Sequence, residues 1–343
     1  VGPDVKADVS GTLALDQTST SNLKYRIEAI DVPELARLAG QEGIGGTATV
    51  EGTVTGNRAA LTTVGTLDGS NLSYNENSAL DLNSTYTVTV PDLQFARARI
   101  EATTDGTFIK AGALEISELT ATTTYEGQKI AFSTNIKEKT RELAATGDVI
   151  LHPDHQEVHL PELAIRTRGV EWRTKPGTEA AIRYGQERIE LDNVQLVSAD
   201  QSLSVDGTIA LKGDAPSAEL NVVAQNVDLQ QLETLLLQQR GFTGKLSANA
   251  KVTGTTEAPT IDGHVEIHNG GFRTYKFESL IADVDYAGQR ATVDATLTQT
   301  PAERITVKGS APMSLFRRSE TGGHVPATAG EEVDLHIQST ALG

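Results

Sequence analysis

The stretch Ser-Leu-Ser-Val-Asp-Gly-Thr-Ile-Ala-Leu, residues 202–211, decides the fold because apolar and polar side chains alternate along it. Leu203, Val205 and Ile209 take the odd positions, and Ser, Asp and Thr take the even ones. A period of two with one polar face is typical of an antiparallel sheet that buries only its other face. The same alternation returns in residues 245–252, 280–286 and 291–298.

Glycine punctuates the alternating segments and predicts short strands with tight connections. Gly46 and Gly52, each followed by Thr, begin or restart such segments. Asp105-Gly106 and Asp206-Gly207 signal either hairpin turns or bulges, and both interpretations stay open because the alternation continues through them. The sequence therefore predicts an all-β fold, a repetitive antiparallel meander interrupted by two short helices.

Those two helices mark an internal repeat. Asp31 and Asp228 are each followed three positions later by Glu or Gln, a capping-box pattern, and they predict helices over 32–40 and 229–240. Equivalent features then recur about 198 residues apart, as expected for a repeat. The aligned positions are Gly46 with Gly244, Val-Thr-Gly 54–56 with Val-Thr-Gly 252–254, and Tyr74 with Tyr275.

The repeat divides the chain into four predicted segments. They are a first β repeat over 1–100, an intervening β meander over 101–200, a second β repeat over 201–316, and a flexible loop with the start of a next strand over 317–343. Because the chain starts at Val1 and closes on a strand-like segment, we expect it to be a piece of a larger protein.

Composition narrows the class of protein. The formal net charge is −17 and no block rich in Lys or Arg is present, which argues against nucleic acid and against an anionic membrane surface as partners. Aromatic residues make up only 4%, so the apolar content is mostly aliphatic and suits strands better than a thick enzyme core. Cys is absent, and no apolar run approaches the roughly 18 residues of a membrane span.

His155, Glu157 and His159 form the pattern that most resembles a chemical site. On a strand these three side chains share one face, and two imidazoles with a carboxylate can ligate zinc. However, successive side chains on that face stand roughly 7 Å apart, too far for one metal ion without convergence. A polar hairpin with its turn at Pro153-Asp154 is therefore the favoured interpretation, and no metal site is predicted.

Ser21 and Lys24 match the Ser-x-x-Lys motif of acyl-transferring serine enzymes. That chemistry needs the serine at a helix N-terminus, whereas Leu23, Tyr25 and the residues around them alternate as a strand does. The sequence also contains no nucleophile elbow, phosphate-binding loop or dinucleotide fingerprint. We therefore predict a protein that is not an enzyme, with no catalytic residues and no cofactor.

A family resemblance begins at Trp172. It runs through Ile-Glu-Leu-Asp-Asn-Val-Gln-Leu at 189–196 and is most specific in Gly-Thr at 254–255, Ala-Pro at 258–259 and Asn-Gly-Gly-Phe at 269–272. This succession resembles the TamB family (translocation and assembly module) and, more distantly, the AsmA-like proteins. The resemblance covers about 165–310 and, more loosely, 20–100. Asn57-Arg58 replaces the Ala-Pro connection in the first repeat, which leaves the branch of the family open.

The resemblance implies a long sheet that curls into an open apolar groove. It further implies a periplasmic segment of a diderm bacterium, anchored in the inner membrane by an N-terminal helix outside this chain. The implied role is phospholipid transport between the membranes, or outer-membrane protein assembly and autotransporter secretion. Its expected partners are phospholipid acyl chains or nascent outer-membrane β-strands, together with an outer-membrane barrel protein.

Periodicity selects the residues expected to line the groove. They are Leu203, Val205, Ile209, Leu211, Leu246, Val252, Val265, Ile267, Val284, Val293 and Leu297. The rival hypothesis is a filled β-sandwich or solenoid that serves as an adhesin-type or structural spacer on the cell surface. Alternation alone predicts both, because either fold buries one face of its strands.

Overall fold

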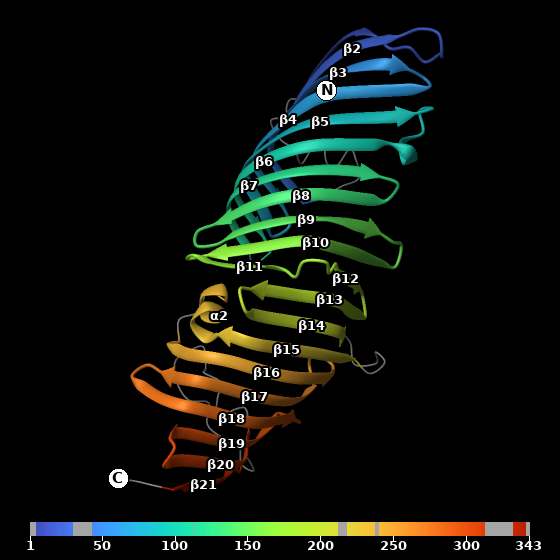
Figure 1. Cartoon of the computed structure of the whole chain (residues 1–343). Coiled ribbons are helices and arrows are strands. Elements are labelled where there is room, and N and C mark those ends of the chain that lie inside the picture. Colours follow the sequence, from blue (N-terminus) through green and yellow to red (C-terminus); the bar gives the residue numbers. More distant parts are fainter. Residues whose placement is uncertain are drawn as a thin grey trace. The chain divides into compact units, whose positions relative to one another are not determined.

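A computed structural model describes residues 5–29, 43–112, 114–211, 218–236, 240–312 and 332–340. In these residues strands dominate and helix is confined to two short segments (Figure 1), which confirms the all-β prediction. The helix predicted over 32–40 lies outside the described residues. Within the described part of the chain, none of the helices is long and apolar enough to cross a lipid bilayer.

The chain forms two compact units. The first comprises Val1–His152 with Glu162–Arg166, and the second comprises Pro153–Pro161 with Thr167–Gly343. These units differ from the four segments expected from the sequence. The units are defined by contacts in space. The four segments are defined by equivalent positions in the predicted repeat.

The first unit is an antiparallel meander in which each strand pairs with the next along the chain. The strands of the first unit are β1 (Val5–Thr12), β2 (Ser21–Ala29), β3 (Ile44–Asn57), β4 (Ala60–Tyr74), β5 (Asn77–Pro91), β6 (Arg99–Ala111), β7 (Leu114–Glu126), β8 (Lys129–Glu138) and β9 (Glu142–Leu151). A short 3-10 helix, η1 (Phe95–Arg97), lies between β5 and β6.

The second unit continues with the same antiparallel order from β12 to β21. β11 and β12 each pair with β13, along different parts of its length. The elements are β10 (His155–Thr167), β11 (Val170–Thr174), β12 (Ala180–Gly185), β13 (Arg188–Ser198), β14 (Gln201–Ala210), β15 (Glu219–Asp228), α2 (Leu229–Leu235), β16 (Phe242–Gly254), β17 (Pro259–Phe272), β18 (Tyr275–Ala287), β19 (Arg290–Thr300), β20 (Glu303–Pro312) and β21 (Asp334–Ser339).

Tight hairpins form at positions that the Asp-Gly pairs did not mark. Gly127-Gln128 joins β7 to β8 and Gly288-Gln289 joins β18 to β19, with positive φ at both residues of each pair. Positive φ at two consecutive turn residues matches the right-handed twist of the flanking strands. Asp105-Gly106 and Asp206-Gly207 instead lie inside β6 and β14, so neither pair is a turn.

The helix predicted to begin after Asp228 is present, and Asp228 caps its N-terminus. The Asp228 carboxylate accepts hydrogen bonds from the backbone N–H groups of Gln230 (3.0 Å) and Gln231 (3.1 Å). The helix itself, α2, ends at Leu235, shorter than the predicted 229–240, and Arg240 is not helical. α2 packs against β15 and β16.

Gln201 completes this cap in place of the expected capping box. Its side chain is only 3% exposed. Gln201 Oε1 accepts from the Asp228 backbone N–H (2.7 Å), and its Nε2 donates to Gln231 Oε1 (2.8 Å). A residue from β14 thereby ties the end of β15 to the first turn of α2.

Corresponding strands of the two predicted repeats carry the same backbone irregularity. β3 and β16 each carry a bulge next to a glycine with positive φ, Gly46 (107°) and Gly244 (119°). Tyr74 pairs with Ile44, and the residue in the same position of the second copy is Phe272, which pairs with Phe242. The expected match of Tyr74 with Tyr275 is therefore wrong, because Tyr275 begins the following strand.

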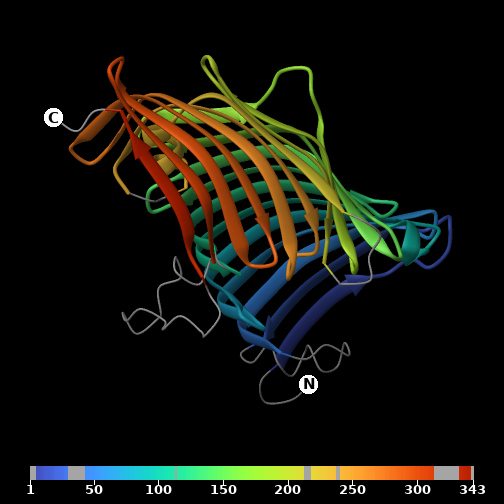
Figure 2. The same ribbon diagram turned by 90° about the horizontal axis from the view of Figure 1, so that it is seen from below.

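Within each unit the strands are bowed in a common direction (Figure 2), as expected for the curled antiparallel sheet. Strongly twisted strands and bulges both bend a sheet in this way. Each unit thus has a concave face and a convex face, in addition to its polar and apolar sides.

Replacing Gln201 with Ala tests the cap. The substitution removes the acceptor of the Asp228 N–H, and we expect about 1–3 kcal/mol lower local stability, the cost of a buried unpaired donor. Hydrogen exchange of residues 226–235 measures it. Gln230→Ala is the matched control, because the Gln230 side chain is exposed on α2. Equal protection in the two variants would contradict the role given to Gln201.

Candidate functional site

One face of the second unit is a continuous apolar surface built by cross-strand pairs. Residues directly opposite in paired strands point to the same side, so the register shows which side chains share the face. One row of such pairs runs Leu196, Leu203, Ala224, Ala248, Val265, Ala282, Ala295 and Val307. The next runs Val194, Val205, Val222, Ala250, Gly263, Val284, Val293 and Gly309.

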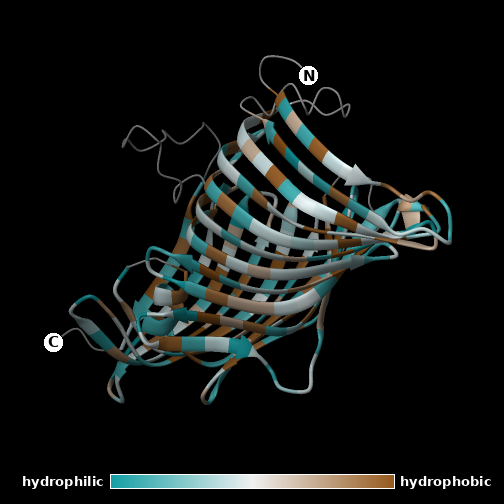
Figure 3. Cartoon of the chain, turned by 90° about the horizontal axis from the view of Figure 1, so that it is seen from above, coloured by the Kyte–Doolittle hydropathy of each residue, from teal (hydrophilic) through white to brown (hydrophobic). Residues whose placement is uncertain are grey.

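The residues expected from periodicity to share a face are brought together on this surface. Ten of the eleven are paired through the same network of rows, and Leu211 follows directly after the end of β14. All eleven side chains are half-buried. In Figure 3 apolar and polar residues alternate along the strands, as this pairing requires.

Two bulges keep the apolar rows continuous. In β13 the apolar face is formed by odd-numbered residues up to Leu191 and by even-numbered residues from Val194 onward. In β15 it is formed by even-numbered residues up to Ala224 and by odd-numbered residues from Val227 onward. Asn193 (φ 54°) and Asn226 (φ 53°) supply the extra residue in a left-handed conformation that Asn tolerates. Without the extra residue, every side chain beyond it would point to the opposite face. These phase changes are visible in the sequence, but strict alternation alone overlooks them.

The opposite face is charged, and its charges pair across neighbouring strands. Lys308 Nζ lies 2.6 Å from Asp294 Oδ2, and Lys251 Nζ lies 2.8 Å from Glu219 Oε2. These groups are about half exposed or more, so each pair adds little stability. Their effect is to keep one face wet and the other apolar.

Of the His155, Glu157 and His159 pattern, Glu157 and His159 belong to one ion-pair network, while His155 Nδ1 lies 3.0 Å from Asp154 Oδ1. Glu157 Oε1 lies 3.1 Å from His159 Nε2 and 3.3 Å from Arg183 Nη2 of β12. Partial burial alone would raise the pKa of Glu157, but the charges of Arg183 and His159 and their hydrogen bonds together outweigh it and hold this pKa below its usual value. His159 Nδ1 also contacts Glu179 at 3.1 Å. The carboxylate therefore joins β10 to β12. The ligand atoms of His155 and Glu157 lie within 4.8 Å of each other, so this pair converges although the strand spacing predicts roughly 7 Å. The absence of a metal site stays a prediction.

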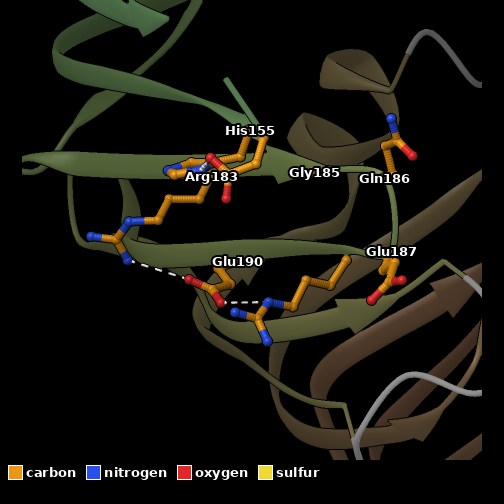
Figure 4. A pocket seen from close by; sticks show the side chains of 8 residues that line it. His155, Arg183, Gly185, Gln186, Glu187 and Glu190 are labelled. Carbon is orange, nitrogen blue, oxygen red and sulfur yellow. Dashed lines mark hydrogen bonds and ion pairs between the residues drawn. The ribbon is translucent and has the colours of Figure 1, made fainter. Parts of the chain in front are cut away.

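A pocket opens beside this network at the hairpin between β12 and β13 (Figure 4). It is lined by Asp154, His155, Arg183, Gly185, Gln186, Glu187, Arg188 and Glu190. Arg188 Nε lies 2.8 Å from Glu190 Oε1, and Arg183 Nη1 lies 3.4 Å from Glu190 Oε2. Because both of its arginines pair with Glu190, the pocket is a salt-bridged surface, and the apolar sheet face is the stronger candidate for function.

The apolar face of the first unit differs from that of the second, because hydroxyl groups interrupt its rows. One row reads Leu23, Val54, Thr63, Val88, Ile100, Tyr125, Ile130 and Val149. Another reads Ile27, Val50, Leu67, Ser84, Thr104, Ala121, Thr134 and Ala145. Periodicity along a single strand does not single out these hydroxyls, because they meet only through the strand register.

Each unit is a curved antiparallel sheet with one apolar and one charged face. This architecture defines a class of repetitive β-sheet proteins in which the candidate functional surface extends over many strands. A family model described as TamB, N-terminal domain, matches residues 5–308. The chain therefore belongs to the TamB family, as its resemblance to that family predicted. No curated protein matches it.

On the charged face, we predict that the stabilising contribution of His264 depends on pH. Hydrogen bonds to Asp283 (2.6 Å) and Glu266 (3.1 Å) raise the pKa of His264 above its ordinary 6.5. Protonation of His264 thus stabilises the folded state. This contribution to the free energy of unfolding is fully present below pH 6.5 and is lost as the pH rises through the raised pKa. In an NMR titration, Asp283→Asn should lower the pKa of His264. Asp148→Asn, in the other unit, should leave it unchanged, and equal values in both variants would contradict the assignment.

Proposed function

We propose that this chain is a non-catalytic bridge segment whose apolar face carries lipid acyl chains or extended outer-membrane β-strands across the periplasm. The observation that carries the proposal is the continuity of the apolar rows in the second unit, strand after strand from β13 to β20. Membership of the TamB family supports a bridge of this kind. On this proposal the full-length protein is anchored in the inner membrane and works with an outer-membrane barrel partner.

The exposure of the apolar face supports an open groove. Large aliphatic residues such as Leu203, Val265 and Ile267 are half-buried, although they stand on the apolar side of their strands. Among the described residues the strands of each unit form one sheet, and α2 packs mainly against β15 and β16. A filled β-sandwich would instead cover this face with a second sheet, so the single layer favours the groove over the structural or adhesin-type spacer.

The curvature favours the apolar side as the concave one. Side chains crowd together on the concave side of a bent sheet and spread apart on the convex side. The exposure follows this pattern in β18, where Ala282 and Val284 are less exposed than Ile281 and Asp283. A concave aliphatic surface without a second layer is suited to shelter an acyl chain from water.

Energetics explain how such a face could bind and still release its cargo. Burial is worth about 0.8 kcal/mol per methylene group, so a two-chain lipid would be held firmly. The rows repeat from strand to strand with similar aliphatic side chains, so a chain can slide along them at little cost. Phospholipid is the first cargo proposed, and an extended outer-membrane strand is the second.

Native mass spectrometry tests the proposal on the segment purified from a bacterial periplasm. We expect phospholipid to copurify with it in amounts that saturate with lipid supply. A lipid-free, monodisperse protein that also excludes hydrophobic dyes would contradict the groove and favour the filled spacer.

A pair of charge substitutions on the apolar face should block transport. Ile209→Arg together with Val265→Glu in the full-length protein would place two charges among aliphatic side chains, where burial is costly. Bacteria carrying this variant should lose envelope integrity, measured as sensitivity to detergent and large antibiotics. Thr208→Arg with Thr260→Glu adds the same charges to the opposite face and should be tolerated. Equal phenotypes in both variants would refute a role for the apolar face.

A further inference from the structure

Two tyrosines cover two glycines on the apolar face of the first unit. Tyr25 of β2 stands opposite Gly52 of β3, and Gly65 of β4 stands opposite Tyr86 of β5. A Cβ atom at Gly52 would lie 2.6 Å from the Tyr25 hydroxyl, and one at Gly65 would lie 2.6 Å from the Tyr86 hydroxyl. The rings therefore lie across the glycines from opposite sides, and their two hydroxyl oxygens meet at 2.6 Å.

Three further hydroxyls extend this cluster. Thr63 Oγ1 lies 2.7 Å from the Tyr25 hydroxyl, and Ser84 Oγ lies 3.0 Å from Thr104 Oγ1. Ser84 is two residues from Tyr86 on the same face of β5, so both groups of hydroxyls adjoin. We call Tyr25, Thr63, Ser84, Tyr86 and Thr104 the hydroxyl island. All five side chains are half-buried.

The hydroxyl island has more donors than it uses internally. Five hydroxyls carry five protons, and three hydrogen bonds join them among the described residues. Two protons are thus left to donate to a molecule lying on the face. Burial, and then the hydrogen bond to Tyr25, raise the pKa of Tyr86 well above its usual value, which keeps this phenol a neutral donor.

The repeat itself does not require these hydroxyls. Gly65 corresponds to Gly263 of the second copy, and the register then places aliphatic residues at all five equivalent positions. These residues are Val222, Ile261, Ala282, Val284 and Ala295. The same backbone is therefore built with hydrocarbon in one copy and with donors in the other. A pure hydrocarbon cargo would strip water from those donors without replacing it, whereas a cargo with oxygen acceptors would satisfy them.

We propose that the hydroxyl island binds the ester or phosphate oxygens of a diacyl glycerophospholipid whose acyl chains lie on the neighbouring aliphatic rows. This inference rests on the proposed function and assigns the polar part of its first cargo to named side chains. The rows on either side supply the hydrocarbon surface, through residues such as Leu23 and Val54 on one side and Ile27 and Val50 on the other. The island thereby gives a sliding lipid a preferred stopping position in the first unit.

Binding of short-chain diacyl phosphatidylcholine to the full chain, measured by calorimetry, tests the island. Tyr25→Phe with Tyr86→Phe keeps both rings over the glycines and removes two hydroxyls. We expect phospholipid binding to weaken about fivefold for each lost hydrogen bond, about 1 kcal/mol each. Binding of pyrene, which is apolar and has no acceptor, should stay unchanged. Tyr125→Phe makes the same change elsewhere on this face and should bind phospholipid like the wild type.

The remaining arms separate the possible failures. An ether-linked phospholipid, which lacks the ester carbonyls, shows which oxygen is bound. If the wild type and the Tyr25→Phe, Tyr86→Phe variant bind it equally, the hydroxyls bind the ester carbonyl. If the variant still binds it more weakly, they bind the phosphate. Wild-type affinity in the Tyr25→Phe, Tyr86→Phe variant would overturn the island while leaving the apolar groove intact. Weaker binding of pyrene would also overturn it, since the face itself would have changed. If the wild type binds neither probe, the proposed function fails as well, and hydroxyl-dependent binding of an extended outer-membrane peptide alone would replace the lipid.

Discussion

Matching of apolar faces from one strand to the next is the constraint on which the structure depends. Each strand has a side-chain period of two, so a slip of one residue would turn its whole apolar set toward water. The chain meets this constraint by pairing each strand with its neighbour in a fixed register and by inserting single residues where the sequence changes phase. Asn193 and Asn226 are two such insertions. Curvature, the two-faced surface and the proposed groove all follow from this agreement.

Much of the fold and of the apolar face could be predicted from sequence because both depend on local periodicity. Residues such as Val205 and Val265 were assigned to one face by alternation, and the register places them there. The cap at Asp228 was likewise visible as a local pattern. Family membership came from a succession of short motifs, and the matching family model confirms it.

Features that depend on pairing between distant residues could not be predicted. Gln201 reaches Asp228 and Gln231 only because β14 and β15 are neighbours. Tyr25 and Tyr86 lie on strands that are separated by two others, and nothing in either local sequence indicates that their hydroxyls meet. The match of Tyr74 with Tyr275 is wrong for a related reason. It rests on residue identity alone, whereas the backbone pairing makes Phe272 the equivalent of Tyr74. Side-chain chemistry across strands thus carries information that periodicity lacks.

The meander order has a consequence for how the protein acquires its structure. From β1 to β9, and again from β12 to β21, each strand finds its partner immediately before or after it in the chain. Contacts of short sequence separation close small loops and lose little entropy, so they form quickly. A chain that emerges gradually during its synthesis can therefore add one strand at a time to a growing edge, without waiting for distant segments. Folding then proceeds strand by strand, in the direction of the chain.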